Sequence, residues 1–123
     1  MQFTSSENTK PLTASFYKDL TFSDTSVVIT PMLESSFGKE IRITFKENQV
    51  MKEHKTKFPI TIMTLKGCIE FSVDGEMSVL KEGDIIALEG GIMHELKANE
   101  ESIVWLGLHK SDSVDRVKSI LKP

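Results

Sequence analysis

The sequence predicts an all-β fold, a barrel or sandwich preceded by an N-terminal arm and closed by a short C-terminal helix. Three observations support this prediction. Short segments of alternating apolar and polar residues recur between Val27 and His109, and turn signals separate them at nearly regular intervals. Helical periodicity is confined to the end of the chain. Many short strands between closely spaced turns are typical of antiparallel barrels and sandwiches.

The bulk composition indicates one globular domain. The chain has 123 residues, of which 39% are hydrophobic and 27% charged, enough for a single core. With a net charge of −3 and no basic face in the central region, a nucleic-acid partner is not expected. The single cysteine, Cys68, cannot form an internal disulfide, so we expect a cytoplasmic protein. No apolar run approaches the roughly 18 residues of a membrane span, so we expect no membrane association.

Residues 1–26 are expected to form an extended arm, because they are rich in Ser, Thr and Asn and have no sustained period. The arm nevertheless contains five large apolar or aromatic side chains that favour burial, namely Phe3, Phe16, Tyr17, Leu20 and Phe22. An exposed monomer surface is a poor environment for them. We therefore expect the arm to wrap its own barrel or a second subunit.

Residues 27–109 are expected to form the barrel. "VVITPML" is an apolar run interrupted by Pro31, and "KEIRITF" alternates strictly, so both are predicted at a sheet edge or on a half-buried face. "ITIMTL" is apolar on both faces, which predicts a central strand ended by Gly67. "CIEFSV" and "EMSVL" flank Asp74 and Gly75, the strongest hairpin signal in the chain.

The remaining turns are "KEGD" at 81–84, "EGG" at 89–91 and "ANEE" at 98–101. Between them, "IIAL" is predicted as a short buried strand, and "SIVWLGL" as a central strand with Trp105 in the core. Residues 110–123 are predicted to contain a helix of about ten residues capped by Ser111 or Asp112. Its apolar face consists of Val114, Val117, Ile120 and Leu121.

Two spaced motifs suggest a family. In the first, Asn48 is followed after five residues by His54, then by Thr56, Ile60 and Gly67. The second contains Gly83, Glu89, Gly91, His94 and Ala98, and fifteen residues separate the two motifs. Over residues 40–109 this pattern resembles the paired motifs of a small single-domain cupin with degenerate metal motifs. The resemblance implies a double-stranded β-helix, or jelly-roll barrel, and a homodimer paired through sheets and exchanged arms.

In metal-binding cupins, three imidazoles and one carboxylate at these positions hold iron, manganese, nickel or zinc. In this sequence His54 and His94 stand at two of the four positions, whereas Thr56 and Ile60 occupy the other two. A catalytic metal normally needs about three protein ligands. The resemblance therefore implies a divalent transition metal that is weakly bound or absent, with His54 and His94 as its only candidate ligands.

Strand alternation predicts which side chains share the interior with the two histidines. If His54 points inward, Lys52 and Thr56 do so too, and if His94 points inward, Ile92 and Leu96 follow. The wall at the missing carboxylate is aliphatic, because Ile60 and Ile62 share one face. The predicted pocket thus contains His54, Thr56, Ile60, Ile62, Ile92, His94 and Leu96.

Three functions remain open from the sequence. The first is a cupin that binds a small, partly apolar molecule in this pocket. The second is a metal-dependent enzyme of dioxygenase, isomerase or lyase type that uses His54 and His94. The third is a non-catalytic interaction or regulatory protein in which the basic C-terminal helix contacts a partner.

Overall fold

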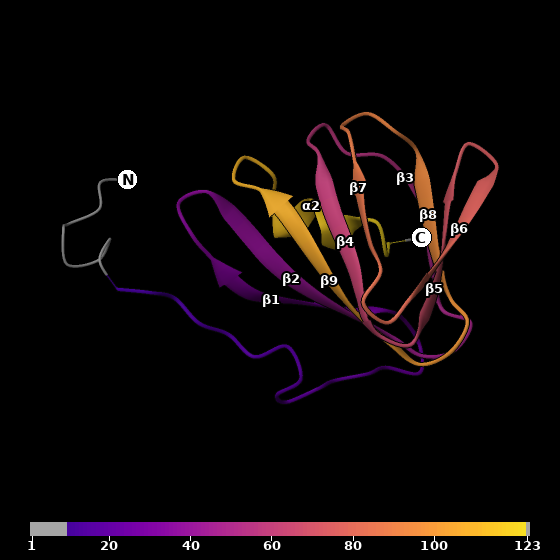
Figure 1. The fold of residues 1–123 in the computed structure, drawn as a ribbon, viewed down its shortest axis with the longest axis horizontal. Helices are drawn as coiled ribbons and strands as arrows, with labels where there is room; N and C mark the ends of the chain where they lie inside the picture. The colour runs from indigo at the N-terminus through magenta and orange to yellow at the C-terminus, as the bar shows by residue number, and fades with distance from the viewer. Residues whose placement is uncertain (1–9, 123) are drawn as a thin grey trace.

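The computed structural model describes residues 10–122 and contains two antiparallel sheets that face each other as a barrel (Figure 1). The order in the first sheet is β1 (Val28–Glu34), β2 (Gly38–Phe45), β9 (Ser102–His109), β4 (Ile60–Lys66) and β7 (Ile85–Leu88). The order in the second is β3 (Val50–His54), β8 (His94–Ala98), β5 (Cys68–Val73) and β6 (Glu76–Lys81). The predicted all-β barrel is confirmed, and β4 and β9 are central as expected.

The core lies between the two sheets and follows the alternation of the strands. Ile41, Ile43 and Phe45 of β2 point inward and are fully buried. Phe71 of β5 and Leu96 of β8 contribute buried side chains from the second sheet. Because the period of two is set by the strand backbone, these inward positions could be read from the sequence.

The structure corrects the prediction that β2 lies at a sheet edge or on a half-buried face. β2 lies between β1 and β9, and Arg42 on its outer face is only 3% exposed. The guanidinium of Arg42 donates to the carbonyl oxygens of Phe16, Lys18 and Asp19 at 3.3, 2.8 and 3.2 Å. The arm therefore covers this face through its main chain, which strand alternation cannot foresee.

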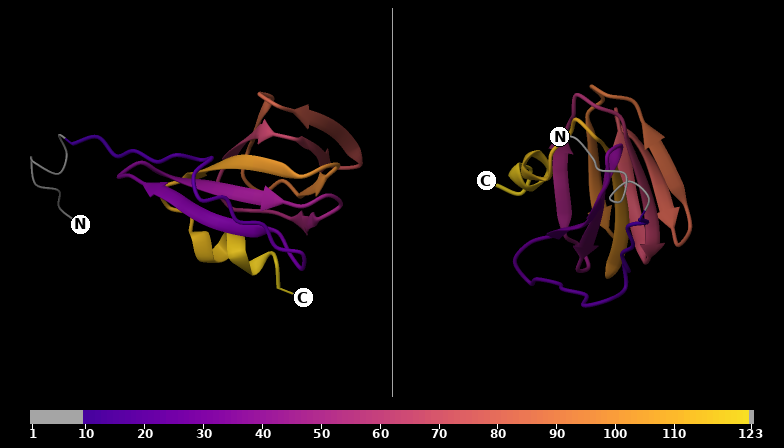
Figure 2. Two further views of the ribbon diagram at one scale, coloured as in Figure 1. Left: turned by 90° about the horizontal axis from the view of Figure 1, so that it is seen from below. Right: turned by 90° about the vertical axis from the view of Figure 1, so that its left-hand side faces the viewer.

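The arm itself runs along the outside of the barrel, and its first described residues extend beyond it (Figures 1 and 2). Phe16 and Phe22 are half-buried, whereas Leu12 and Tyr17 are 59% and 56% exposed. Phe3 lies outside the described residues. The arm is thus anchored to its own barrel but leaves apolar side chains uncovered.

Two further expectations about side-chain placement are wrong. Among the described residues β7 is an edge strand that pairs only with β4, so its Ile85 is 53% exposed rather than buried. Trp105 lies on the outer face of the central strand β9 and donates from Nε1 to Glu40 Oε1 at 2.7 Å. Neighbouring inward residues Val104 and Leu106 fill the core instead.

Left-handed backbone occurs at the predicted turns. Asp74 and Gly75 have φ values of 51° and 79° in the β5–β6 hairpin, as this dipeptide favours. Asn48, at the position where the cupin motif has glycine, also has a positive φ of 70°. Asparagine tolerates this conformation better than most residues, so the turn survives the replacement.

The C-terminal helix, α2 (Val114–Ser119), is shorter than predicted and lies on the side of the barrel away from the β5–β6 hairpin (Figure 2). Its N-cap is Ser113, whose Oγ accepts from the main-chain N of Arg116 at 3.1 Å, and not Ser111 or Asp112. Val117 is buried against the core. Within residues 10–122 no helix has the length and apolarity to cross a membrane.

Candidate functional site

The two histidines meet because β3 and β8 pair directly. His54 lies opposite His94 in the ladder, and their ring centroids are 4.2 Å apart with an interplanar angle of 61°. Phe71 stacks on His94 with a centroid distance of 5.5 Å. Sequence spacing placed both imidazoles in one pocket, and the structure brings them into contact.

A β-bulge between Met51 and His54 determines which neighbours accompany His54 inward. The bulge places one extra residue on β3, so Met51 and His54 share the inner face although they are three positions apart. Lys52 was expected inward but is exposed, and its Nζ donates to the carbonyl oxygen of Lys122 at 3.2 Å. The pocket therefore has a methionine where simple alternation predicts a lysine.

The hydrogen bonds of both imidazoles fix their tautomers. Nδ1 of His54 lies 2.8 Å from the carbonyl oxygen of Lys52, and Nδ1 of His94 lies 2.9 Å from that of Ile92. A carbonyl oxygen only accepts, so each Nδ1 carries the hydrogen and each neutral ring has its lone pair on Nε2. Within residues 10–122 neither Nε2 atom has a hydrogen-bond partner.

Both histidines are held in the neutral form. Burial is the main cause that lowers the pKa of His54 from 6.5 to about 4, and the charges of His94 and Arg116 add to it. Burial also lowers the pKa of His94, again with a contribution from Arg116. At neutral pH the site therefore presents two uncharged hydrogen-bond acceptors.

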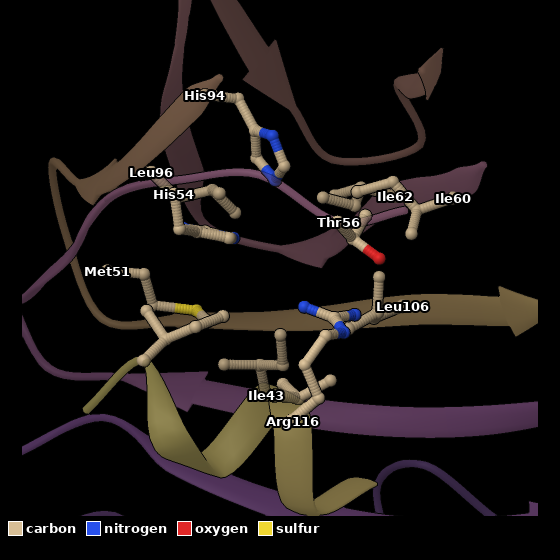
Figure 3. Close-up of a pocket in the computed structure, with 12 residues that line it drawn as sticks. Ile43, Met51, His54, Thr56, Ile60, Ile62, His94, Leu96, Leu106 and Arg116 are labelled. Carbon is tan, nitrogen blue, oxygen red and sulfur yellow. The ribbon is translucent and has the colours of Figure 1, made fainter. Parts of the chain in front are cut away.

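Arg116 is the polar lining residue that sequence reasoning missed. It lies on α2, and its guanidinium points into the barrel toward His54 and Thr56 (Figure 3). Nε and Nη2 donate to the two oxygens of Asp112 at 2.6 and 2.7 Å. The i,i+4 spacing of these two residues in "SDSVDRVKS" was a signal for an ion pair, but not for its inward direction.

Asp112 connects the helix to the barrel. Thr56 Oγ1 donates to Asp112 Oδ2 at 3.2 Å, and the main-chain N of Ser113 donates to Oδ1 at 2.8 Å. Burial opposes ionisation of the carboxyl group, but the hydrogen bonds and charge of Arg116 outweigh it and hold the pKa of Asp112 below its usual range. The carboxylate is therefore charged and fully engaged.

These side chains surround a cavity of about 10 Å³, which has room for about one water molecule (Figure 3). Six of the seven predicted pocket residues line it, whereas Ile92 contributes only the carbonyl oxygen that orients His94. The complete lining consists of Ile43, Met51, His54, Thr56, Ile60, Ile62, His94, Leu96, Leu106, Arg116, Val117 and Ile120. The cavity is aliphatic apart from a cluster of four polar side chains.

Solved structures with the same architecture come from several bacteria. An RmlC-like cupin protein from Desulfovibrio desulfuricans matches with a TM-score of 0.75 and 21% identity, covering 82% of this chain and 98% of the other. The protein has the cupin fold. A double-stranded β-helix protein from Klebsiella pneumoniae has a TM-score of 0.73 and 18% identity to this cupin-fold chain, covering 85% of it and 95% of the other.

A conserved protein of unknown function from Streptococcus pyogenes has a TM-score of 0.69 and 19% identity, covering 85% of this chain and 90% of the other. No family model and no curated protein matches the sequence. At these identities the comparisons establish the cupin fold, and the chemistry of the protein must be inferred from the residues of its site.

The side chains of this cupin barrel do not fit a transition-metal site. Among residues 10–122, no group of three or more His, Cys, Asp or Glu side chains could hold a metal ion. The carboxylate that contacts the polar lining of the cavity, Asp112, is engaged by Arg116, and the Thr56 hydroxyl donates to the same carboxylate. A cation would meet the guanidinium charge with only two neutral ligands to offset it.

Proposed function

We propose that this protein binds a small molecule inside its barrel through a metal-independent site. One observation carries the proposal: two neutral imidazoles, whose Nε2 atoms have no hydrogen-bond partner among residues 10–122, line one cavity with the guanidinium of Arg116 and the hydroxyl of Thr56, and the rest of the lining is apolar. A mostly apolar cavity with a few convergent polar groups is the usual form of a small-molecule site. The polar groups orient the ligand, and the aliphatic wall binds its apolar part.

The polar and the aliphatic side chains of the cavity have different roles. His54, His94 and Arg116 line the same cavity, and a ligand head group would form hydrogen bonds with them. Ile60, Ile62 and Leu106 form aliphatic wall, and burial of an apolar group against it contributes about 25 cal/mol per Å². No charge transfer or bond cleavage is required of these residues for binding.

A ligand larger than one water needs additional room, and α2 is the element best placed to give it. The helix has six residues, and its Arg116 and Val117 close the cavity together with Ile120 at the C-cap. Isolated helices shorter than about 12–15 residues are marginal in water, so α2 depends on its contacts with the barrel. A ligand would therefore displace the apolar side chains of Val117 and Ile120, while Asp112 continues to hold the guanidinium of Arg116.

A fragment screen on metal-free protein tests the proposal. Thermal shift and ligand-observed NMR should yield fragments that stabilise the wild type, because a ligand that binds only the folded state raises its stability. His94→Phe, which removes one of the two imidazole acceptors, should abolish these hits, whereas His109→Phe changes an exposed histidine outside the cavity and should retain them.

Two results would contradict the proposal. One is the absence of any hit from a broad fragment library on folded wild-type protein. The other is a stoichiometric transition metal, detected by elemental analysis of untagged protein, that disappears in both His54→Ala and His94→Ala. That second result would instead support a metal-dependent enzyme.

A further inference from the structure

We propose that the ligand is a small neutral molecule whose head group has two hydrogen-bond donors beside one acceptor, as in a primary carboxamide. This inference rests on the proposed small-molecule function and names the class of ligand. The donors and acceptors that line the cavity determine which head group can pair with all of them.

The acceptors are the two Nε2 atoms. Because each Nδ1 hydrogen is directed at a main-chain carbonyl oxygen, His54 and His94 can offer only a lone pair to the cavity. His94 is 1% exposed, and the ring is also held by stacking on Phe71. Rotation to present a donor would leave the carbonyl oxygen of Ile92 without this partner, so the polarity of the site is fixed.

The donor is Nη1 of Arg116. Nε and Nη2 are occupied by the two oxygens of Asp112, and within residues 10–122 Nη1 has no hydrogen-bond partner. Thr56 adds no further donor, because its hydroxyl hydrogen is directed to Asp112 and its oxygen accepts from the main-chain N of Phe58 at 3.3 Å. The polar side chains of the cavity thus present two acceptors and one donor group.

Charge selects a neutral ligand. The positive charge of Arg116 is already matched by Asp112 in a two-point ion pair. A second carboxylate would meet the like charge of Asp112 and the lone pairs of both imidazoles. A cation would meet the guanidinium. A neutral head group avoids both penalties.

A primary carboxamide has the complementary pattern. Its two N–H hydrogens would be donated to Nε2 of His54 and Nε2 of His94, and its carbonyl oxygen would accept from Nη1 of Arg116. A short alkyl substituent would lie against the aliphatic wall formed by Ile60 and Ile62. One water molecule has the same two donors and an acceptor, so it is the competitor that a ligand must displace.

Three matched probes test the class. Propionamide, N,N-dimethylpropionamide and propionate share an alkyl chain, but only the first combines neutrality with two donors. Each is titrated into 15N-labelled wild-type protein, with the histidine side-chain nitrogens as the readout. We expect propionamide to bind at least about tenfold more tightly than either analogue, which corresponds to about 1.4 kcal/mol, and to shift the Nε2 signals of His54 and His94.

Variants then locate the binding. His54→Phe and His94→Phe should each weaken propionamide binding about tenfold or more, whereas His109→Phe should leave it unchanged. Arg116→Lys retains the charge but not the planar fork and should also weaken binding. Because the three probes are compared on the wild type, the test does not depend on any variant being folded.

The outcomes separate the two proposals. Equal binding of the three probes, tighter binding of propionate, or no binding of propionamide overturns the inference about ligand class. If fragments of another class still bind and are lost in His94→Phe, the proposed small-molecule function stands. If no fragment binds the folded protein, both proposals fail.

Discussion

Mild acid should destabilise this protein through His54. The pKa of His54 is about 4 in the folded state, whereas an exposed histidine in the unfolded chain has a pKa of 6.5. Below pH 6.5 the imidazole of His54 is therefore protonated in the unfolded chain, whereas in the folded protein it stays neutral down to about pH 4. The contribution of the neutral His54 to stability is fully present above pH 6.5 and is lost as the pH falls from 6.5 to 4.

The size of the effect follows from these two values. At pH 5, the difference between pKa values of about 4 and 6.5 corresponds to about 2 kcal/mol of lost stability before solvent screening is considered. His54 is only partly buried, and solvent screening reduces the figure to about 1 kcal/mol. That loss is a noticeable fraction of the roughly 5–15 kcal/mol that stabilises a typical domain.

Urea denaturation of wild type and His54→Gln at pH 7.5, 6 and 5 measures this contribution. Glutamine keeps a polar side chain but does not titrate, so the difference between the two proteins cancels most other acid effects. The free energy of unfolding of the wild type, relative to the variant, should fall by about 1 kcal/mol between pH 7.5 and pH 5. His109→Gln controls for loss of an exposed histidine.

A difference between wild type and His54→Gln that stays constant within about 0.3 kcal/mol would refute the reasoning. It would mean that the imidazole is free to take up a proton in the folded state. A wild type that becomes more stable relative to His54→Gln as the pH falls would refute the reasoning more strongly, since a protonated His54 would then stabilise the fold.

The other predictions concern the helix, the arm and assembly. Asp112→Asn should lower the free energy of unfolding by about 2–3 kcal/mol, because it leaves the guanidinium of Arg116 without its carboxylate; a loss below about 0.5 kcal/mol in chemical denaturation would contradict this. Arg42→Met should speed tryptic cleavage in the arm, measured by mass spectrometry, because it removes three hydrogen bonds to arm carbonyl oxygens; an unchanged rate would show that the arm is held otherwise. We also propose a homodimer in which Leu12 and Tyr17 of the arm pack on a second copy. Light scattering should show a dimer, and the double variant Leu12→Ser with Tyr17→Ser should raise its dissociation constant at least about tenfold. A monomeric wild type would exclude this homodimer.

The sequence determined the architecture because strand and turn signals are local. The alternation in "KEIRITF", the all-apolar "ITIMTL" and the Asp74–Gly75 turn each reflect the chemistry of adjacent residues. The spacing of glycines and histidines in the two motifs indicated the cupin barrel, and it placed His54 and His94 in one cavity. These features depend on period and spacing, which the sequence contains in full.

The polarity and the size of the cavity were decided only in the folded chain. One extra residue in the β3 bulge replaces Lys52 by Met51 on the inner face, and pattern reasoning cannot locate such a bulge. Arg116 enters the cavity because α2 packs across the barrel and Asp112 holds its guanidinium there. The β3–β8 pairing that contains the bulge and the packing of α2 on the barrel both join segments distant in sequence, so their energies are defined by tertiary packing and not by a local pattern.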